Sequence, residues 1–291
     1  MPRVAVVSDS TAYLPREVVE ANQITLVSLY INWGGERTER EADITDINGF
    51  MEDLRGGEHL PTTSQPSVGD FVGAYEPLLA DGGEVVSIHI SGGISGTVEA
   101  ARQAAEALER DGKGGERVHV MDSATAAGGL GIVALAAARR AGQGGNSEEV
   151  LTAAHEARDA LKMWFAIDTL EFLRRGGRIG GAAAFIGTTL RIKPILTLEA
   201  EITPVERVRT SKRAFERMVA YARQRKESGA NGWVVQHIQA EEQAQRLIDA
   251  CHEVFGVDPV FVSEIGPVLA AHTGPGLLGV GGVPRAMLTD A

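Results

Sequence analysis

The regular alternation of short β-type runs with helical patterns through the first half of the chain limits the fold most. Such an alternation is typical of a parallel sheet whose strands are joined by crossover helices. We expect strands at Val4–Val7, Ile24–Ile31, Val85–Ile90 and Val118–Met121. We expect helices at Arg16–Ala21, Ile47–Arg55, Val68–Leu79, Val98–Arg110 and Ala127–Ala141. Ser67 and Asp70 resemble a capping box that opens the third of these helices.

The second half shows a different order. Glycines at 142, 144 and 145 break the first pattern, and Ser147 is a good N-cap for a helix that runs to about Leu161. Strand-like runs follow at Trp164–Ile167, Lys193–Leu198, Ile202–Val208, Trp233–Ile238 and Val260–Ile265. Helical patterns lie between them at Leu170–Arg175, Lys212–Lys226 and Glu241–Phe255. We therefore expect an α+β unit with a mixed or antiparallel sheet.

The length of 291 residues is large for a single hydrophobic core. We predict an α/β fold of two domains. Residues 1–160 form an α/β domain with a parallel sheet and hydroxyl-rich ligand loops, and residues 161–291 form an α+β domain that completes the ligand site.

Composition excludes several classes of function. The formal net charge of −11 argues against a nucleic-acid partner and against an anionic membrane surface. Cys251 is the only cysteine, so the chain forms no internal disulfide and no cysteine-based metal site, and the histidines show no metal-ligand spacing. The N-terminus lacks a signal-peptide pattern, and Leu130–Ala138 is too short to span a bilayer. We expect a cytoplasmic protein with no stable membrane insertion, no metal and no cofactor.

The segment Ser91–Thr97 is the first candidate for binding chemistry. It joins the strand Val85–Ile90 to an alanine-rich helix, which directs unpaired backbone N–H groups and the positive end of the helix at one point. Gly92, Gly93 and Gly96 allow close approach to a ligand, and the hydroxyls can donate to an anion. The segment matches neither a P-loop, nor a dinucleotide fingerprint, nor a nucleophile elbow. The alternative is a simple helix cap.

Three other hydroxyl-rich segments follow or precede regular elements in a similar way. They are Ser8–Thr11, Pro61–Ser67 and Asp122–Ser123. We expect the second, which contains Thr63 and Ser64, to be a stiff polar loop at a helix start. Capping explains each of them singly. Because loops beyond the carboxyl ends of parallel strands converge on one crevice, we expect the four segments to share a site.

Basic side chains and one histidine in the second half complete the candidates. The basic stretch contains Arg174, Arg175 and Arg178, with Arg191, Lys193, Arg207 and Arg209 beyond it. A solvated face explains most of them, but Arg178 follows two glycines and Arg209 ends a strand. An arginine in such a position can hold a carboxylate or phosphate with a bidentate fork. His272 falls in the Gly/Pro-rich segment Ala271–Gly276, where we expect a loop and a donor, a base or a turn cap.

Taken in order, these segments resemble the DegV family, the fatty-acid-binding proteins that serve as acyl-carrying subunits of bacterial fatty acid kinase. The matching stretches are Val7–Thr11, Thr63–Ser67, Ser91–Thr97, Asp122–Ser123, Gly176–Ile179, Lys193–Leu196, Arg209–Thr210 and His272–Gly276. They cover nearly the full chain, and the ordered set is more specific than any single member.

The resemblance implies a long-chain fatty acid bound between two domains. Thr63 and Ser95, with Ser64 and Gly96 beside them, would hold the carboxylate, and His272 would join directly or through water. Arg178 and Arg209 would form the outer basic part of the network. The family presents the acyl carboxylate to a separate fatty acid kinase catalytic subunit and is not itself an enzyme. Two alternatives stay open: a hydrolase or phosphotransferase that uses Ser95 and His272 with Asp9 or Asp122 as orienter, and a lipid-sensing regulator.

Overall fold

The structure is a computed structural model that describes residues 3–34, 37–56, 61–186 and 192–289, so Arg191 lies outside the described residues. The strands are β1 Val4–Asp9, β2 Thr25–Val27, β3 Tyr30–Trp33, β4 Arg37–Arg40, β5 Thr62–Ser64, β6 Glu84–His89, β7 Val118–Asp122, β8 Lys162–Ala166, β9 Lys193–Glu199, β10 Glu201–Val208, β11 Gly232–His237, β12 Phe261–Glu264 and β13 Leu278–Val283. The helices are α1 Arg16–Ala21, α2 Ile47–Gly56, α3 Val68–Leu79, α4 Thr97–Arg110, α5 Gly128–Gly142, α6 Ser147–Ala160, α7 Glu171–Arg175, α8 Ser211–Glu227, α9 Glu241–Phe255 and α10 Pro267–Thr273.

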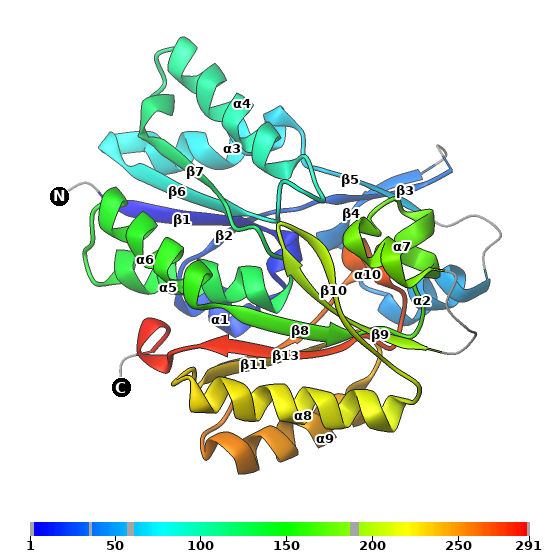
Figure 1. The fold of residues 1–291 in the computed structure, drawn as a ribbon. Coiled ribbons are helices and arrows are strands. Elements are labelled where there is room, and N and C mark those ends of the chain that lie inside the picture. Colours follow the sequence, from blue (N-terminus) through cyan, green and yellow to red (C-terminus); the bar gives the residue numbers. More distant parts are fainter. Residues whose placement is uncertain (1–2, 35–36, 57–60, 187–191, 290–291) are drawn as a thin grey trace.

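The first half forms the expected parallel sheet. Its strands lie in the order β2-β1-β6-β7, and every neighbouring pair is parallel. Helices α3 and α4 cover one face, and α5 and α6 cover the other (Figure 1). The capping box of Ser67 and Asp70 at the start of α3 is confirmed. The helix after the glycine-rich break is capped by Asn146, one residue before the expected Ser147, because the Asn146 side chain accepts the Glu149 N–H.

The second half contains a mixed sheet of order β10-β9-β8-β13-β11-β12, in which only β11 and β12 are parallel. Helices α8 and α9 cover its outer face, while α5 and α6 contact its inner face (Figure 1). Helix α5 is buried between the two sheets, and one core cluster joins Val6 and Val86 of the first sheet to Val234 and Val283 of the second. The fold class is confirmed, and the domain division at residue 160 stays a prediction.

A small third sheet closes one end of the molecule. It has the order β4-β3-β5 and is antiparallel. Ile31 of β3 lies in one buried cluster with Phe50 and Met51 of α2 and with Val268 and Ala271 of α10. This packing sets β5 beside α10 and so positions the site described below.

Three expectations from sequence were wrong. The run Ile24–Ile31 forms two strands in different sheets, because the Leu29 backbone N–H donates to the Ser10 hydroxyl and the Leu29 carbonyl accepts the Glu41 N–H instead of continuing a ladder. The Ser28 hydroxyl accepts the Ala42 N–H beside them. The segment Pro61–Ser67 was expected to be a loop, but its residues Thr62–Ser64 form strand β5. His272 lies in the last turn of α10, which Pro267 opens and Gly274, with φ of 74°, ends.

Strand β13 was not predicted at all. Its sequence Leu-Gly-Val-Gly-Gly-Val contains three glycines, and glycine is depleted in strands. A β-carbon at Gly281 would lie 2.3 Å from the Lys162 carbonyl oxygen, and one at Gly282 would lie 2.4 Å from that of Gly232. The neighbouring backbones therefore approach too closely for a side chain at these positions, which explains the composition of this central strand.

Within the described residues, no helix is both long and apolar enough to cross a membrane. The same part of the chain holds no group of three or more histidine, cysteine or acidic residues placed to bind a metal ion.

Candidate ligand-binding site

A cavity of about 220 Å³ lies where β5, the loop after β6, the segment after α7 and helix α10 meet. We call it the His272 cavity. Its polar lining is Thr63, Ser64, Gln65, Ser95, Gly96, Arg178, His272 and Thr273. Its apolar lining is Leu29, Ile90, Ile94, Leu173, Ile202, Val268 and Leu269. Six of the seven site residues expected from sequence thus line one cavity, whereas Arg209 is exposed at the end of β10 and does not line it.

Thr63 and His272, which are 209 positions apart in sequence, are joined by a hydrogen bond of 2.7 Å between Thr63 Oγ1 and His272 Nε2. The other ring nitrogen, Nδ1, is buried and has no partner among the described residues. An unpaired buried N–H costs more than an unpaired ring acceptor, so we assign the proton to Nε2, which donates to Thr63. The Thr63 hydroxyl then keeps its own proton free to donate to a ligand.

The surroundings of His272 keep the ring neutral. Burial and, to a smaller extent, the nearby guanidinium of Arg178 together lower the pKa of His272 from its ordinary value of 6.5 to about 4. Gly176 packs against the ring, since a β-carbon there would lie 2.3 Å from Nδ1. Gly274 is equally close to the Phe172 ring. Glycine at position 176 therefore leaves room for the His272 ring, and glycine at position 274 leaves room for the Phe172 ring.

Ser95 lines the same cavity, next to the start of α4. Its Oγ lies 2.9 Å from Thr97 Oγ1, and the helix N-cap is Gly96. The first turn of α4 also leaves backbone N–H groups without acceptors inside the helix. Ser95 and the start of α4 therefore bring a hydroxyl group and positive potential to this part of the cavity, which favours an anion there.

Arg178 lies at the rim of the cavity. Its side chain donates to the carbonyl of Gly176 at 2.8 Å and to that of Ile94 at 3.3 Å. Ile94, Ser95, Gly96, Arg178 and Ile202 also line an adjoining hollow of about 420 Å³ that is more open to the surface. The part of the His272 cavity lined by Ser95, Gly96 and Arg178 therefore adjoins a hollow that is more open to solvent.

The expectation that four hydroxyl-rich segments share the site was wrong for two of them. Asp9 accepts the Ile90 N–H at 2.9 Å, and Asp122 accepts the Gly92 N–H at 3.1 Å. These carboxylates hold the Ser91–Thr97 loop and do not line the cavity. The Ser91 hydroxyl, expected to face a ligand, donates to the Ala200 carbonyl and ties this loop to the β9–β10 turn.

The same bonds bear on a Ser95–His272 catalytic pair. Asp9 and Asp122 both bond to groups other than His272, and His272 Nδ1, which an orienting carboxylate would contact, has no partner among the described residues. The described part of the chain supplies no orienter for the histidine.

Glu41 supports the site and had no signal in the sequence beyond being one of many acidic residues. It is buried, it accepts hydrogen bonds from Tyr13 Oη at 2.6 Å and from the Val268 N–H at 2.8 Å, and Ser10 also donates to it. Burial raises the pKa of Glu41 above its usual range. Its bond to Val268 fixes the first turn of α10, the helix that carries His272.

A cavity lined by apolar side chains, an uncharged hydroxyl–histidine cluster and a cation at the rim has the chemistry that suits an amphiphilic anion. A family model described as "Uncharacterised protein, DegV family" matches residues 3–285. The chain belongs to the DegV family.

Individual relatives agree with this assignment. A DegV domain-containing protein of Streptomyces coelicolor is 39% identical over 280 residues, which are 95% of this chain and 97% of the relative. A DegV family protein from Thermus thermophilus, whose solved structure is described as fatty acid binding, has a TM-score of 0.85 at 35% identity and covers 97% of this chain and 99% of its own. DegV of Bacillus subtilis, described as a fatty acid binding protein, has a TM-score of 0.83 at 32% identity with the same coverage.

Proposed function

We propose that this chain binds a long-chain fatty acid in the His272 cavity and presents its carboxylate to a separate fatty acid kinase subunit. The observation that carries the proposal is the Thr63–His272 hydrogen bond in a cavity that Ser95 and seven apolar side chains also line. Solved family members described as fatty acid binding support the ligand class. Thr63 and Ser95 donate to the carboxylate, His272 holds the Thr63 hydroxyl in position, and Arg178 supplies positive charge at the rim.

The two parts of the site have different energetic roles. A sixteen-carbon chain has roughly fourteen methylenes, and at about 0.8 kcal/mol for each buried CH₂ the tail contributes on the order of 11 kcal/mol. A hydrogen bond to a charged group contributes only about 1.5–3 kcal/mol. The tail therefore dominates affinity, while the hydroxyls orient the head group and discriminate against uncharged lipids.

The presentation step is supported by the shape of the site at its polar end. Ser95, Gly96 and Arg178 line both the His272 cavity and the open hollow beside it, so a carboxylate held between them is reachable from solvent. The hollow is bordered by Gly93, Gly177 and Gly180, which leave backbone without side chains in front of the head group. A partner that transfers a phosphoryl group needs such access.

Native mass spectrometry of the protein purified from a bacterial host tests the ligand class. We expect near-equimolar fatty acid, which is lost on extraction and restored by adding palmitate. Several preparations without lipid that also fail to take up palmitate would contradict the proposal.

The presentation step has a separate test. With a purified bacterial fatty acid kinase catalytic subunit, ATP and the palmitate-loaded protein, we expect acyl phosphate, and we expect much less from Arg178→Gln. A loaded protein that gives no acyl phosphate with kinase subunits active on other family members would refute presentation and leave fatty acid binding intact.

A further inference from the structure

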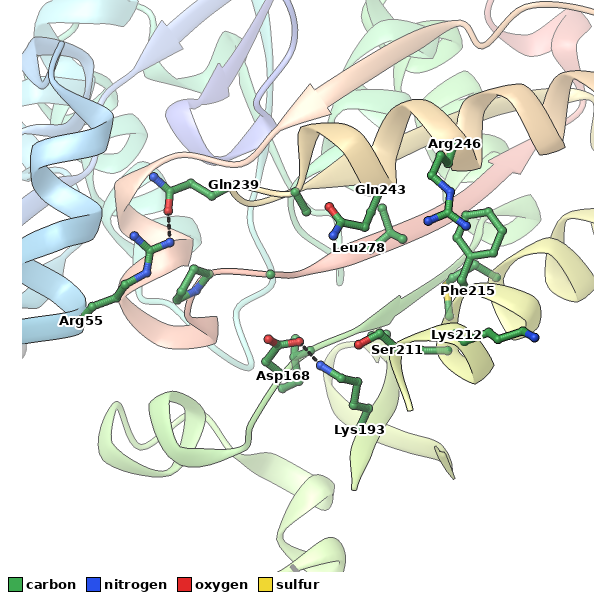
Figure 2. A pocket seen from close by; sticks show the side chains of 17 residues that line it. Arg55, Asp168, Lys193, Ser211, Lys212, Phe215, Gln239, Gln243, Arg246 and Leu278 are labelled. Carbon is green, nitrogen blue, oxygen red and sulfur yellow. Dashed lines mark hydrogen bonds and ion pairs between the residues drawn. The ribbon is translucent and has the colours of Figure 1, made fainter. Parts of the chain in front are cut away.

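A second cavity, of about 600 Å³, shares no lining residue with the His272 cavity. Its polar lining includes Arg55, Asp168, Lys193, Lys212 and Arg246, and we call it the basic cavity. In Figure 2, Arg55 and Gln239 lie at one end, Asp168 and Lys193 meet in the middle, and Arg246 lies against Phe215 at the other end.

The charge of this cavity is opposite to that of the chain. Its four cationic side chains come from four separate elements, α2, β9, α8 and α9, and Asp168 is the one acidic residue among the lining residues. The chain as a whole has a net charge of −11. A fold that brings four cations together in an acidic protein concentrates positive potential at one concave place.

Most of these cations have no acidic partner. Lys193 pairs with Asp168, but Arg55 bonds to the neutral Gln239, and the guanidinium of Arg246 lies 5.2 Å from the centre of the Phe215 ring. Within the described residues, Arg55, Lys212 and Arg246 form no ion pair. All three side chains are exposed, so their positive charge is accessible to an anionic ligand.

The floor of the basic cavity is apolar. Ala166, Ile167, Ala214, Met218 and Leu278 form it, beside the Phe215 ring. Helix α8 begins at Ser211 in the wall, so its first N–H groups add to the positive potential. The volume falls within the range of roughly 300–1,000 Å³ that is usual for small-molecule sites.

We propose that the basic cavity binds a phosphorylated small molecule, with its phosphates between the cations and its organic part on the apolar floor. Arg55 and Arg246 offer the planar forks that suit phosphate oxygens. A small molecule fits better than an acidic protein segment, because strands, helices and the turn at Pro275 and Gly276 enclose the floor on several sides.

Isothermal titration calorimetry on the full chain at 0.15 M salt, with ADP and inorganic pyrophosphate as probes, tests this proposal. The site variant is Arg55→Gln/Arg246→Gln. The control is Arg110→Gln/Arg223→Gln, which removes the same charge from two exposed helix positions outside the cavity. Thermal unfolding of both variants checks that each is folded.

We expect saturable ADP binding that is at least 10-fold weaker in the site variant and within 2-fold of wild type in the control. We expect pyrophosphate to bind more weakly than ADP, because it has no organic part for the floor. Palmitate preloading leaves ADP binding unchanged, which separates this site from the His272 cavity.

Three results would overturn the proposal. They are absence of saturable binding of either probe at millimolar concentration, equal losses in both double variants, and tight binding of a glutamate-rich peptide by a protein that ignores both phosphate probes. The last would assign the surface to a protein partner.

Discussion

Two histidines in this protein belong to polar clusters of similar composition but opposite completeness, of which the His89 cluster is fully buried and the His272 cluster is partly buried. His89 Nδ1 lies 3.1 Å from Asp9 Oδ2, its Nε2 lies 2.6 Å from Ser87 Oγ, and Ser87 in turn bonds Tyr75 at 2.8 Å. All four side chains are fully buried. His272 has one partner, Thr63, and its second ring nitrogen has none among the described residues.

The difference in hydrogen bonding distinguishes a structural cluster, around His89, from a candidate ligand-binding cluster, around His272. In the His89 network each side-chain donor has an acceptor, and Asp9 lines neither the His272 cavity nor the basic cavity. Around His272, the hydroxyls of Thr63 and Ser95 face a cavity that the protein itself does not fill. Buried polar groups are normally satisfied. An incomplete cluster beside an apolar cavity is therefore the better indication of a ligand, although both clusters contain the same kinds of residue.

The largest effect should come from breaking the complete network. Asp9→Ala leaves the Thr11 N–H, the Ile90 N–H and His89 Nδ1 without their acceptor. At about 1–3 kcal/mol for each unsatisfied buried donor, we expect a loss of at least ~3 kcal/mol in the free energy of unfolding. Urea unfolding measures it, with the exposed Asp159→Ala as control. Wild-type stability in Asp9→Ala would show that the network is not structural.

A pH titration of stability examines the incomplete cluster. The folded-state pKa of His272 is about 4, below the ordinary 6.5, so the unfolded chain binds the proton more readily. The contribution of neutral His272 to the free energy of unfolding is complete above pH 6.5 and is lost as the pH falls towards 4. In the lipid-free protein this loss is on the order of 3 kcal/mol. His272→Gln should flatten this part of the stability curve, whereas His155→Gln, an exposed helix position, should not. Parallel curves for all three proteins would contradict the burial of His272.

The shape of the cluster can be tested without removing a polar atom. Gly176→Ala adds a methyl group 2.3 Å from His272 Nδ1, although the backbone φ of −73° at Gly176 suits alanine. The ring must move to make room, which disturbs its bond to Thr63, and we expect palmitate affinity to fall about tenfold, equivalent to ~1.4 kcal/mol. Gly73→Ala, which meets no atom within 4 Å, is the matched control. If both variants bind palmitate like wild type, the position of the ring does not matter.

The regular elements could be predicted from local pattern because their signals are local. Val68–Leu79 has an apolar face, a capping box and clear ends, and the helix has those bounds. Strand β13 could not be predicted in this way, because its glycines are required by the close approach of the Lys162 and Gly232 backbones. These contacts exist only in the folded sheet. Helix α10 has seven residues, begins with Pro267 and is followed by Gly274, and a helix of this length is too short for a periodic signal.

The residues of the candidate site also differ in whether the sequence could predict their roles. The resemblance of the ordered motifs to the DegV family predicted a shared site for Thr63, Ser95 and His272, and these three residues line one cavity. The sequence did not indicate that Asp9 and Asp122 serve the loop from beneath, since a carboxylate that binds backbone N–H groups and one that faces a ligand look alike in a motif. Glu41 and Arg55 act across 227 and 184 positions, with Val268 and Gln239, and carry no local signal.

The central claim is that Thr63, Ser95 and His272 recognise a carboxylate, and head-group discrimination tests it most directly. The measurement is the ratio of the Kd of methyl palmitate to that of palmitate, in wild type, Thr63→Val and the adjacent Thr62→Val, whose side chain does not line the cavity. We predict a ratio of at least about 10 in wild type and Thr62→Val, since one charge-assisted hydrogen bond is worth about 1.5–3 kcal/mol, and a several-fold smaller ratio in Thr63→Val. Equal ratios in all three proteins would contradict the account.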